Sequence, residues 1–461
     1  MKYVDLFAGC GGLSLGLERA GFELVVAVEK SEMAAETFYH NFVKRLKSKD
    51  EWKQYSESSI ENQFNNRVVT KEVGELLAND DLMKRIRDLE IDIVVGGPPC
   101  QGFSLAGRRN PDDVRNKLPW QFLEFVEKTN PKAVVIENVV GISRNFKNGE
   151  PAPFDQLQEA LREIGEGYVV QPVHVNAMHY GVPEHRPRLM ILGLRKDIAK
   201  SMNISSTNKL WYSDYSDLVK DIPALAPIPS IESKHARTVL DAISDLSDIK
   251  PKNQSRTSKK FVEEMKDARL WNLKPLTENS VPNQTPRNHQ EKAVNRFRLY
   301  QYLRLQGLAS KTLNIPDQYD ATLARDILND LYANVQIPAL APDGTLLANS
   351  RDELIDLTFE LKTKKHSQRS LHWDKPSPTV VTLPDDYIHP SEPRIFTVRE
   401  LARFQSFPDA FEFRAKETTG GTNRRNEVPQ YSQVGNAVAP LLALAVGQRF
   451  YEILSNNEKT N

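Results

Sequence analysis

The chain contains 461 residues, enough for two domains and at least one sizeable hydrophobic core. Hydrophobic residues make up 39% and charged residues 26%, which excludes a disordered or fibrous protein, and no apolar run reaches the roughly 18–20 residues that span a bilayer. Lys and Arg together number 61 and Asp and Glu number 61, so the whole chain lacks the basic excess of many nucleic-acid binders.

Only two cysteines, Cys10 and Cys100, are present, which excludes a disulfide framework and a zinc site built on cysteines. The first residues, Met1 to Asp5, lead directly into a predicted strand and do not have the shape of a signal peptide. We therefore expect a cytoplasmic protein that binds no membrane and no metal.

The first thirty residues predict one unit of an α/β fold. Residues 3–8 form an apolar strand, residues 9–12 (Gly-Cys-Gly-Gly) a glycine-rich turn, and residues 13–21 a helix that ends at a glycine. The next strand, 22–28, stops at Glu29, a carboxylate that suits bonding to ribose hydroxyls. The spacing fits a dinucleotide or S-adenosylmethionine equally well. The turn does not match the Gly-x-Gly-x-x-Gly pattern of pyrophosphate binders, however, which favours a ligand without phosphates.

The next part of the chain leads to a candidate nucleophile. Residues 43–66 are polar and charged, and we interpret them as a solvated helical insertion without an assigned function. A short strand at 67–69 and a helix over about 74–89 precede a buried strand, 91–95, and the turn Gly96-Gly97-Pro98-Pro99-Cys100. A thiol on a rigid turn at the carboxyl end of a strand is a candidate nucleophile, although a lone cysteine there is more often a small buried residue.

Charged side chains from two further segments are predicted at the same edge. The strand 133–139 carries Glu137 near its end, so two consecutive strands deliver a cysteine and a carboxylate. Residues 168–176 and 189–194 predict a β-hairpin, and Arg186 and Arg188 alternate on one face of the extended segment between them. Two such arginines can bind a carboxylate, a phosphate or a base edge, and a structural salt bridge is the alternative.

From about residue 196 to residue 372 the alternation of strands and helices weakens, which predicts a separate inserted domain. Between Lys234 and Lys311 there are sixteen Lys and Arg against eight Asp and Glu, and part of this excess lies on a predicted helix, 292–305. Such an excess suits nucleic-acid phosphates, although a solvated face also explains a run of charges. A capped helix at 397–405 and an apolar helix that opens at 433–440 then return to the α/β pattern, so we predict a discontinuous catalytic domain.

Six segments follow one another in a recognisable order: residues 5–12 (DLFAGCGG), 97–104 (GPPCQGFS), 137–139 (ENV), 183–188, 399–409 and 433–438. In this order and spacing they resemble the motifs of the C5-cytosine-specific DNA methyltransferase family. A compact chain with one large inserted region and no extra regulatory domain adds the hypothesis of a bacterial member of the restriction–modification type. The resemblance implies an α/β fold. A Rossmann-like S-adenosylmethionine-dependent methyltransferase domain, 1–195 completed by 373–461, would hold a smaller inserted target-recognition domain, 196–372.

The resemblance also implies how the reaction proceeds. Cys100 would add to C6 of a flipped-out cytosine, which activates C5, and Glu137 would act as the acid at N3. Arg188 would hold the cytosine carbonyl and Arg186 would support the site. The DNA contacts would come from Gln101, Ser104 and Arg115. The implied partners are double-stranded DNA and, without a stable complex, a restriction endonuclease, and we expect a monomer.

S-adenosylmethionine is the implied cofactor, and ten positions carry over to its binding: Phe7, Gly9, Cys10, Gly11, Gly12, Glu29, Glu72, Leu118, Asn436 and Ala437. Two positions depart from the family pattern. Lys30 stands where an aromatic residue is common, and Lys71-Glu72 stand where an aspartate is usual, so the aspartate's role falls here to Glu72.

Three other functions remain as alternatives. A tRNA cytosine-C5 methyltransferase of the same fold would have a shorter variable region than this chain. A dinucleotide-dependent oxidoreductase would explain Glu29, but it would not explain Cys100 and Glu137 together. A binding module on an inactive scaffold would have no need for those two residues.

Overall fold

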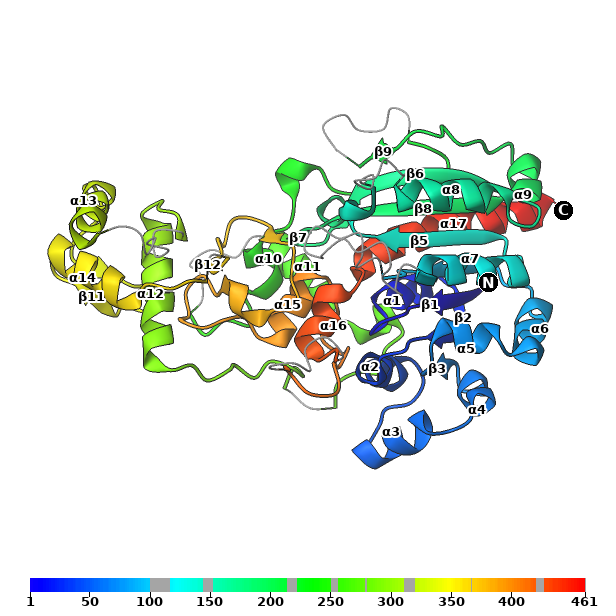
Figure 1. Ribbon diagram of the computed structural model, residues 1–461, viewed down its shortest axis with the longest axis horizontal. Coiled ribbons are helices and arrows are strands. Elements are labelled where there is room, and N and C mark those ends of the chain that lie inside the picture. Colours follow the sequence, from blue (N-terminus) through cyan, green and yellow to red (C-terminus); the bar gives the residue numbers. More distant parts are fainter. Residues whose placement is uncertain are drawn as a thin grey trace.

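The computed structural model describes residues 1–99, 117–143, 152–213, 222–249, 256–277, 280–310, 320–365, 367–419 and 427–460. These residues form a body around a mixed sheet and a smaller lobe that extends from it (Figure 1). The predicted α/β class is confirmed.

The central sheet is made of β1 (Lys2–Leu6), β2 (Glu23–Val28), β3 (Val68–Val69), β4 (Ile93–Gly96), β5 (Ala133–Asn138), β6 (Tyr168–Asn176), β8 (Pro187–Arg195) and β9 (Trp211–Tyr212). Within the described residues the strand order is β3-β2-β1-β4-β5-β8-β6-β9. The first five strands in that order are parallel, whereas β8 runs antiparallel to β5 and β6. The order reverses between β1 and β4, and in such sheets ligands bind at the carboxyl ends of the strands beside this point.

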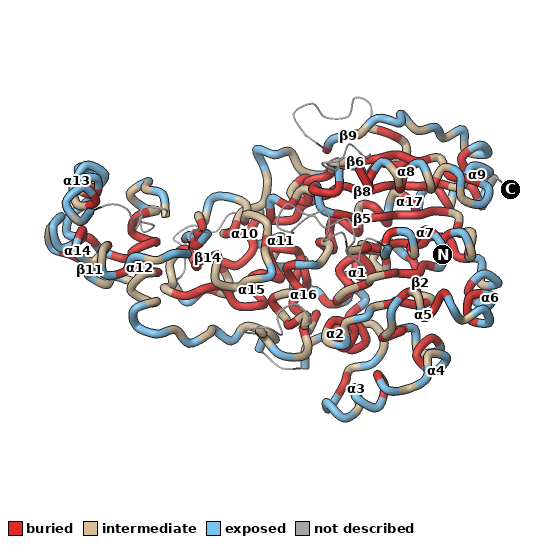
Figure 2. Tube along the Cα trace, viewed as in Figure 1, coloured by how far each residue is buried: buried red, intermediate tan, exposed pale blue. Residues whose placement is uncertain are grey.

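Alternate residues of the strands enter two hydrophobic cores on opposite faces of the sheet. In β5, Val134 and Ile136 enter one core, whereas Ala133 and Val135 enter the other. The first core is covered by α5 (Val73–Leu77), α6 (Asp80–Asp88), α7 (Leu118–Thr129) and α8 (Pro153–Glu163), and the second by α1 (Gly12–Arg19), α2 (Glu32–Phe42), α9 (Lys196–Ser201) and α17 (Pro440–Thr460). Figure 2 shows the strands buried between these layers.

The C-terminal helix α17 lies along α1, so the two ends of the chain share one core. At the contact between the two helices, Gly16 of α1 lies against the backbone of Ala443 and Leu444 in α17.

No single helix in the described residues is long and apolar enough to cross a membrane. The helices α16 (Gln430–Asn436) and α17, bent by 42° relative to each other, meet that length and composition criterion only as a pair.

A middle group of helices also packs on the second core: α10 (Val239–Ile243), α11 (Arg256–Lys266), α15 (Val398–Phe404) and α16. The lobe has a hydrophobic core of its own, built from α12 (Glu291–Leu305), α13 (Ala321–Leu331), α14 (Arg351–Leu361) and the hairpin β10 (Ala339–Leu340) and β11 (Leu346–Ala348). We call these elements the distal lobe. The short strands β7 (Glu184–His185), β12 (Arg369–Ser370), β13 (Ser377–Pro378) and β14 (Tyr387–Ile388) connect the parts, with β7 paired to β13 and β12 to β14. The predicted domain boundaries at 196 and 372 remain predictions.

Several predicted elements agree with the structure and two differ. The hairpin of β6 and β8 is confirmed, as is the capped helix α15, whose N-cap Thr397 and Glu400 form a capping box. The single helix expected at 74–89 is wrong: α5 ends at Leu77, and the side chain of Asn79 accepts from Leu82 N to begin α6. The segment 43–66 is helical in α3 (Lys49–Ser56) and α4 (Ile60–Asn65), but it is not merely solvated, because several of its side chains, among them Trp52 and Tyr55, are buried.

The contact between α1 and α17 predicts that Gly16→Ala destabilises the protein, although Gly→Ala in a helix usually stabilises. Gly→Ala within a helix normally stabilises by about 0.5–1 kcal/mol. At Gly16 the new methyl group would overlap the backbone of α17, so Gly16→Ala should lower the free energy of unfolding by about 1–3 kcal/mol. Denaturant titration of the variant and the parent measures this difference in the free energy of unfolding.

Gly74→Ala in α5 is the matched control. Its methyl group would meet only the flexible side-chain end of Gln121, at 2.8 Å, so this variant should be neutral or slightly more stable than the parent. Equal stability changes in the two variants would contradict the proposed packing of α17 on α1.

Candidate active site

The ends of β4 and β5 lie side by side at the carboxyl edge of the sheet. Gly96 pairs with Ile136 in register, which brings Gly97 next to Glu137, and a β-carbon on Gly97 would be 3.0 Å from Glu137 Oε2. The next residue, Asn138, donates from Nδ2 to Pro98 O at 2.9 Å. The turn that leads to position 100 is therefore held directly against the end of β5.

Glu137 forms an ion pair with Arg188. The distance between Arg188 Nε and Glu137 Oε1 is 2.7 Å, and the two side chains are only 10% and 11% exposed. Because β8 is antiparallel to β5, its first residues enter the sheet where β5 ends, and this brings Arg188 to Glu137. Burial, with the nearby Arg186 charge, lowers the pKa of Arg188 to about 10, so the guanidinium is still charged at neutral pH. The sheet thus presents a paired acid and cation beside the Gly97–Pro99 turn.

Arg186 is buried and bonds mainly to backbone. Its Nη2 donates to Gly435 O and Ala437 O, both at 2.8 Å, and its Nη1 donates to Val380 O at 3.3 Å. Nη1 also contacts Glu184 at 3.2 Å, and burial raises the pKa of that carboxyl. The structure therefore places Arg186 as a support between the segment 184–188 and the turn at 435–437.

The glycine-rich turn after β1 combines left-handed backbone with close packing. Phe7, Gly9 and Gly11 have φ of 58°, 56° and 99°. A β-carbon on Gly9 would meet nothing within 4 Å, whereas one on Gly12 would overlap the carbonyl of Val438. The turn is thus open on one side at Gly9 and closed by the C-terminal segment at Gly12. Burial raises the pKa of the Cys10 thiol to about 12, which makes it an unreactive core residue.

Glu29 lies at the end of β2 and folds back onto this turn. Its Oε2 accepts from Gly9 N at 2.9 Å and its Oε1 from Ser31 N at 2.7 Å, and burial raises the pKa of the carboxyl. The two residues that depart from the expected pattern meet each other, since Lys30 Nζ lies 2.5 Å from Glu72 Oε1 in an exposed ion pair. Glu72 also caps α5.

The remaining predicted positions are distributed as follows. Leu118 begins α7, Asn436 ends α16, and Ala437 follows it in the turn that Arg186 holds. Four predicted residues, Cys100, Gln101, Ser104 and Arg115, lie outside the described residues. Within the described ranges no group of three or more His, Cys, Asp or Glu could hold a metal ion.

Residues 1–452 match the family model for C-5 cytosine-specific DNA methylases. The chain belongs to this family. It is a DNA (cytosine-5-)-methyltransferase, and the sequence-based assignment is confirmed.

Curated relatives agree with the assignment, and a solved structure supports the fold. Type II methyltransferase M.DdeI of Desulfomicrobium norvegicum is 30% identical over 453 residues, which are 97% of this chain and 88% of the relative. Type II methyltransferase M.AgeI of Thalassovita gelatinovora is 31% identical over 481 residues, 97% of this chain and 98% of the relative. A crystal structure of a prophage-encoded E. coli protein assigned as a DNA modification methyltransferase superposes with a TM-score of 0.55 at 24% identity, covering 99% of both chains, and supports the fold.

Sequence reasoning missed one buried carboxylate in this methyltransferase. Asp5 of β1 lies beneath the glycine-rich turn, and it accepts a 2.6 Å hydrogen bond at Oδ2 from Ser14 Oγ. Burial raises the pKa of Asp5 to about 7. The signal was present, because an acidic residue inside an apolar strand is unusual and needs a partner.

The buried Asp5 predicts a pH-dependent stability. Its folded-state pKa of about 7 lies above the unfolded value, so its stabilising contribution is complete at low pH and is lost between about pH 4 and pH 7. Asp5→Asn cannot ionise and keeps an acceptor for Ser14. Its free energy of unfolding, relative to the parent, should rise by about 1.4 kcal/mol per pH unit over that window and then level off.

Urea unfolding of both proteins at pH 5, 6, 7 and 8 measures this difference. Glu124→Gln, which neutralises an exposed carboxylate on α7, is the control and should show no comparable trend. A difference between Asp5→Asn and the parent that does not change with pH would contradict the raised pKa.

Proposed function

We propose that this methyltransferase acts on a cytosine flipped out of a specific double-stranded DNA sequence, through a covalent bond between Cys100 and C6. The observation that carries the proposal is the Glu137–Arg188 pair, 2.7 Å apart, beside the Gly97–Pro99 turn that immediately precedes Cys100. With the Cys100 thiolate expected next to this turn, the acid and the cation would complete a set suited to covalent activation of a pyrimidine.

The proposed roles follow from the chemistry of cytosine. The Cys100 thiolate adds to C6, and Glu137 holds a proton at N3, so the electrons of the C5–C6 bond become available at C5. Arg188 has five N–H donors, and its bonds to Glu137 and Pro187 O use only part of them, which leaves donors for the cytosine carbonyl. Once C5 carries the methyl group, its proton leaves to solvent and the C5–H electrons re-form the C5–C6 double bond, while the C6–S bond breaks with its electrons returning to sulfur. Return of the N3 proton to Glu137 completes the aromatic ring.

The described residues fit S-adenosylmethionine, which supplies an electrophilic methyl group when bound. The space over Gly9 is open, as a cofactor lying on the glycine-rich turn requires. Each oxygen of Glu29 accepts one backbone bond, so each keeps a lone pair for a ribose hydroxyl. Phe7, Leu118 and the turn at 436–437 would close the pocket, while Glu72, already paired with Lys30, would lie at its rim.

The biological setting is also part of the proposal. The family is one of DNA methylases, and M.DdeI and M.AgeI carry type II names, which support duplex DNA as substrate and protection of host DNA from a restriction endonuclease. A tRNA substrate is not favoured. We further propose that residues 196–372 recognise the DNA sequence, that residues 1–195 and 373–461 carry out catalysis, and that the enzyme works as a cytoplasmic monomer.

Incubation with a methyl donor and random duplex DNA that contains 5-fluorocytosine tests the covalent step. Fluorine at C5 cannot leave as a proton does, so the protein should remain bound to the DNA in a complex that survives denaturing gel electrophoresis. Cys100→Ser should form no such complex and should lose methylation by about a thousandfold or more. Methylation by Cys100→Ser at a rate near that of the parent would refute the mechanism.

Glu137→Gln tests the acid. The amide keeps the shape of the side chain but cannot transfer a proton, so kcat should fall by about 10²–10⁴-fold while S-adenosylmethionine still binds. Glu124→Gln on α7 makes the same chemical change at an exposed ion pair and should keep the activity of the parent. An unchanged kcat in Glu137→Gln would exclude this carboxyl as the acid.

A further inference from the structure

The hydrophobic cores of the body and of the distal lobe meet at one loop, residues 388–395. Ile388 and Ile395 face each other in a β-bridge and are both buried in the core of the distal lobe. Between them, His389 N donates to Arg394 O at 2.9 Å and closes the loop. The next residue, Phe396, is already buried in the core of the body. We call residues 388–395 the junction loop.

On its lobe side the junction loop is held by two residues of α12. Gln301 is fully buried, and its Nε2 donates to His389 O at 2.8 Å and to Glu392 O at 2.7 Å. One turn further along, Arg304 donates from Nη2 to Pro390 O at 2.9 Å and from Nε to Ser370 Oγ at 3.2 Å. Because the same helix supplies Phe297 and Tyr300 to the lobe core, these bonds fix the junction loop to the lobe, and a rotation of the lobe against the body must break either them or the bonds on the body side.

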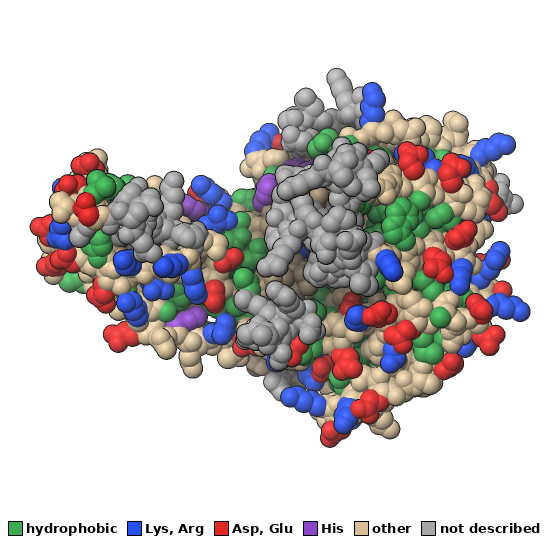
Figure 3. Space-filling view, in the orientation of Figure 1, with side chains coloured by type: hydrophobic (Ala, Val, Ile, Leu, Met, Phe, Trp, Pro, Cys, Tyr) green, Lys and Arg blue, Asp and Glu red, His purple; other side chains and the backbone are tan. Residues whose placement is uncertain are grey.

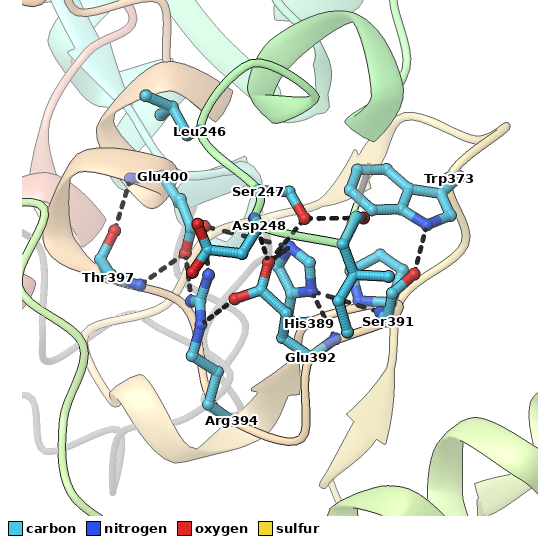
Figure 4. Close-up of polar contacts among 12 residues, drawn as sticks. Leu246, Ser247, Asp248, Trp373, His389, Ser391, Glu392, Arg394, Thr397 and Glu400 are labelled. Atoms are coloured by element: carbon cyan, nitrogen blue, oxygen red, sulfur yellow. Dashed lines mark hydrogen bonds and ion pairs between the residues drawn. The ribbon is translucent and has the colours of Figure 1, made fainter. Parts of the chain in front are cut away.

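On its body side the loop is held by charged groups. Glu392 Oε1 accepts from Ser247 Oγ at 2.6 Å and from Asp248 N at 3.0 Å, while its Oε2 accepts from Arg394 Nε at 2.8 Å. Arg394 in turn forms two parallel bonds to Glu400 of α15, at 2.7 and 2.8 Å (Figure 4). Bidentate pairing of this kind fixes direction as well as distance.

The imidazole of His389 adds a neutral anchor to the loop. Its Nδ1 accepts from Ser391 N at 3.2 Å and Glu392 N at 2.9 Å, and its ring packs edge-on against Trp373. Burial lowers the pKa of His389 to about 4, so the ring is uncharged at neutral pH. The backbone of the loop is thus bonded from inside as well as from both flanks.

The charge of the lobe suggests what this rigidity serves. Lys and Arg side chains gather over α12, on the half of the lobe nearer the body, whereas Asp and Glu collect toward the tip (Figure 3). A basic surface of this kind suits DNA phosphates. For a duplex bound there, the angle between the lobe and the body would decide how it meets the Glu137 edge.

We propose that Gln301 is a positioning residue that fixes the angle of the distal lobe through the junction loop, and thereby the register of the DNA on the enzyme. The inference rests on the proposed function, since it requires that the lobe binds the duplex. Gln301 touches neither the cofactor turn nor the Glu137–Arg188 pair, so its effect is expected on the binding and discrimination of DNA rather than on the chemical step.

Gln301→Leu is the principal test, because leucine keeps a similar volume but donates no hydrogen bond. The recognition site is first found by methylation-aware sequencing of DNA treated with the parent enzyme. Methyl transfer is then measured with duplexes that carry this site and with duplexes in which one base pair of the site is altered. We expect KM for DNA to rise about tenfold with kcat changed less than about twofold, and the ratio of kcat/KM between correct and altered sites to fall about tenfold.

Tyr332→Phe is the matched control. It removes one buried hydrogen bond, 2.9 Å long, between Tyr332 Oη and Thr358 Oγ1 inside the lobe core and leaves the junction loop intact. This variant should lower Tm but keep the kinetics and the discrimination of the parent. Arg304→Met, which breaks the bonds to Pro390 and Ser370 at a less buried position, should shift KM and discrimination in the same direction as Gln301→Leu and remains informative if that variant does not fold.

The outcomes separate the two proposals. If Gln301→Leu and Arg304→Met kept the discrimination and KM of the parent, or changed them no more than Tyr332→Phe does, the positioning role would be wrong while the methylation mechanism stood. If the parent enzyme transferred no methyl group to duplex DNA, the proposed function would fail and the positioning role with it.

Discussion

The ion pair between Glu137 and Arg188 depends on the register of two antiparallel strands. A pair of charges that is about nine-tenths removed from water is unfavourable unless its geometry is good, and the 2.7 Å contact meets that condition. The contact exists because β8 runs back along β5 and begins where β5 ends. A slip of one residue would turn Arg188 to the opposite face of the sheet and leave Glu137 buried without a partner.

The rest of the body maintains this edge from a distance. Arg186, two residues before Arg188, bonds the carbonyls at 435 and 437, so the start of β8 and the C-terminal turn are held as one unit. The glycine-rich turn is fixed from the same side, because Gly12 lies directly against Val438. The glycine-rich turn expected to bind the cofactor and the start of β8, which carries Arg188, are therefore both held by the C-terminal segment around residues 435–438.

The sequence was sufficient wherever local chemistry decides the structure. The apolar strands, the glycine-rich turn and the capping box at Thr397 could all be predicted, because each depends on neighbouring residues. Pairings between distant residues could not be predicted, since they follow from register and packing. Examples are Glu137 with Arg188, Lys30 with Glu72, and Asp5 with Ser14. The helix expected at 74–89 divides because Asn79 competes for a backbone donor, a choice that hydrophobic periodicity does not reveal.

The junction loop shows why a polar connection suits an enzyme whose proposed catalytic and DNA-recognition functions lie on different cores. A purely apolar contact between the cores would tolerate small rotations, because hydrophobic burial is nearly independent of direction. Hydrogen bonds from Gln301 and the bidentate bond from Arg394 to Glu400 are lost when the angle changes. These hydrogen bonds add little to the free energy of unfolding once the cost of removing the polar groups from water is counted. The buried polar groups are therefore better explained by the orientation that they impose than by the stability that they add.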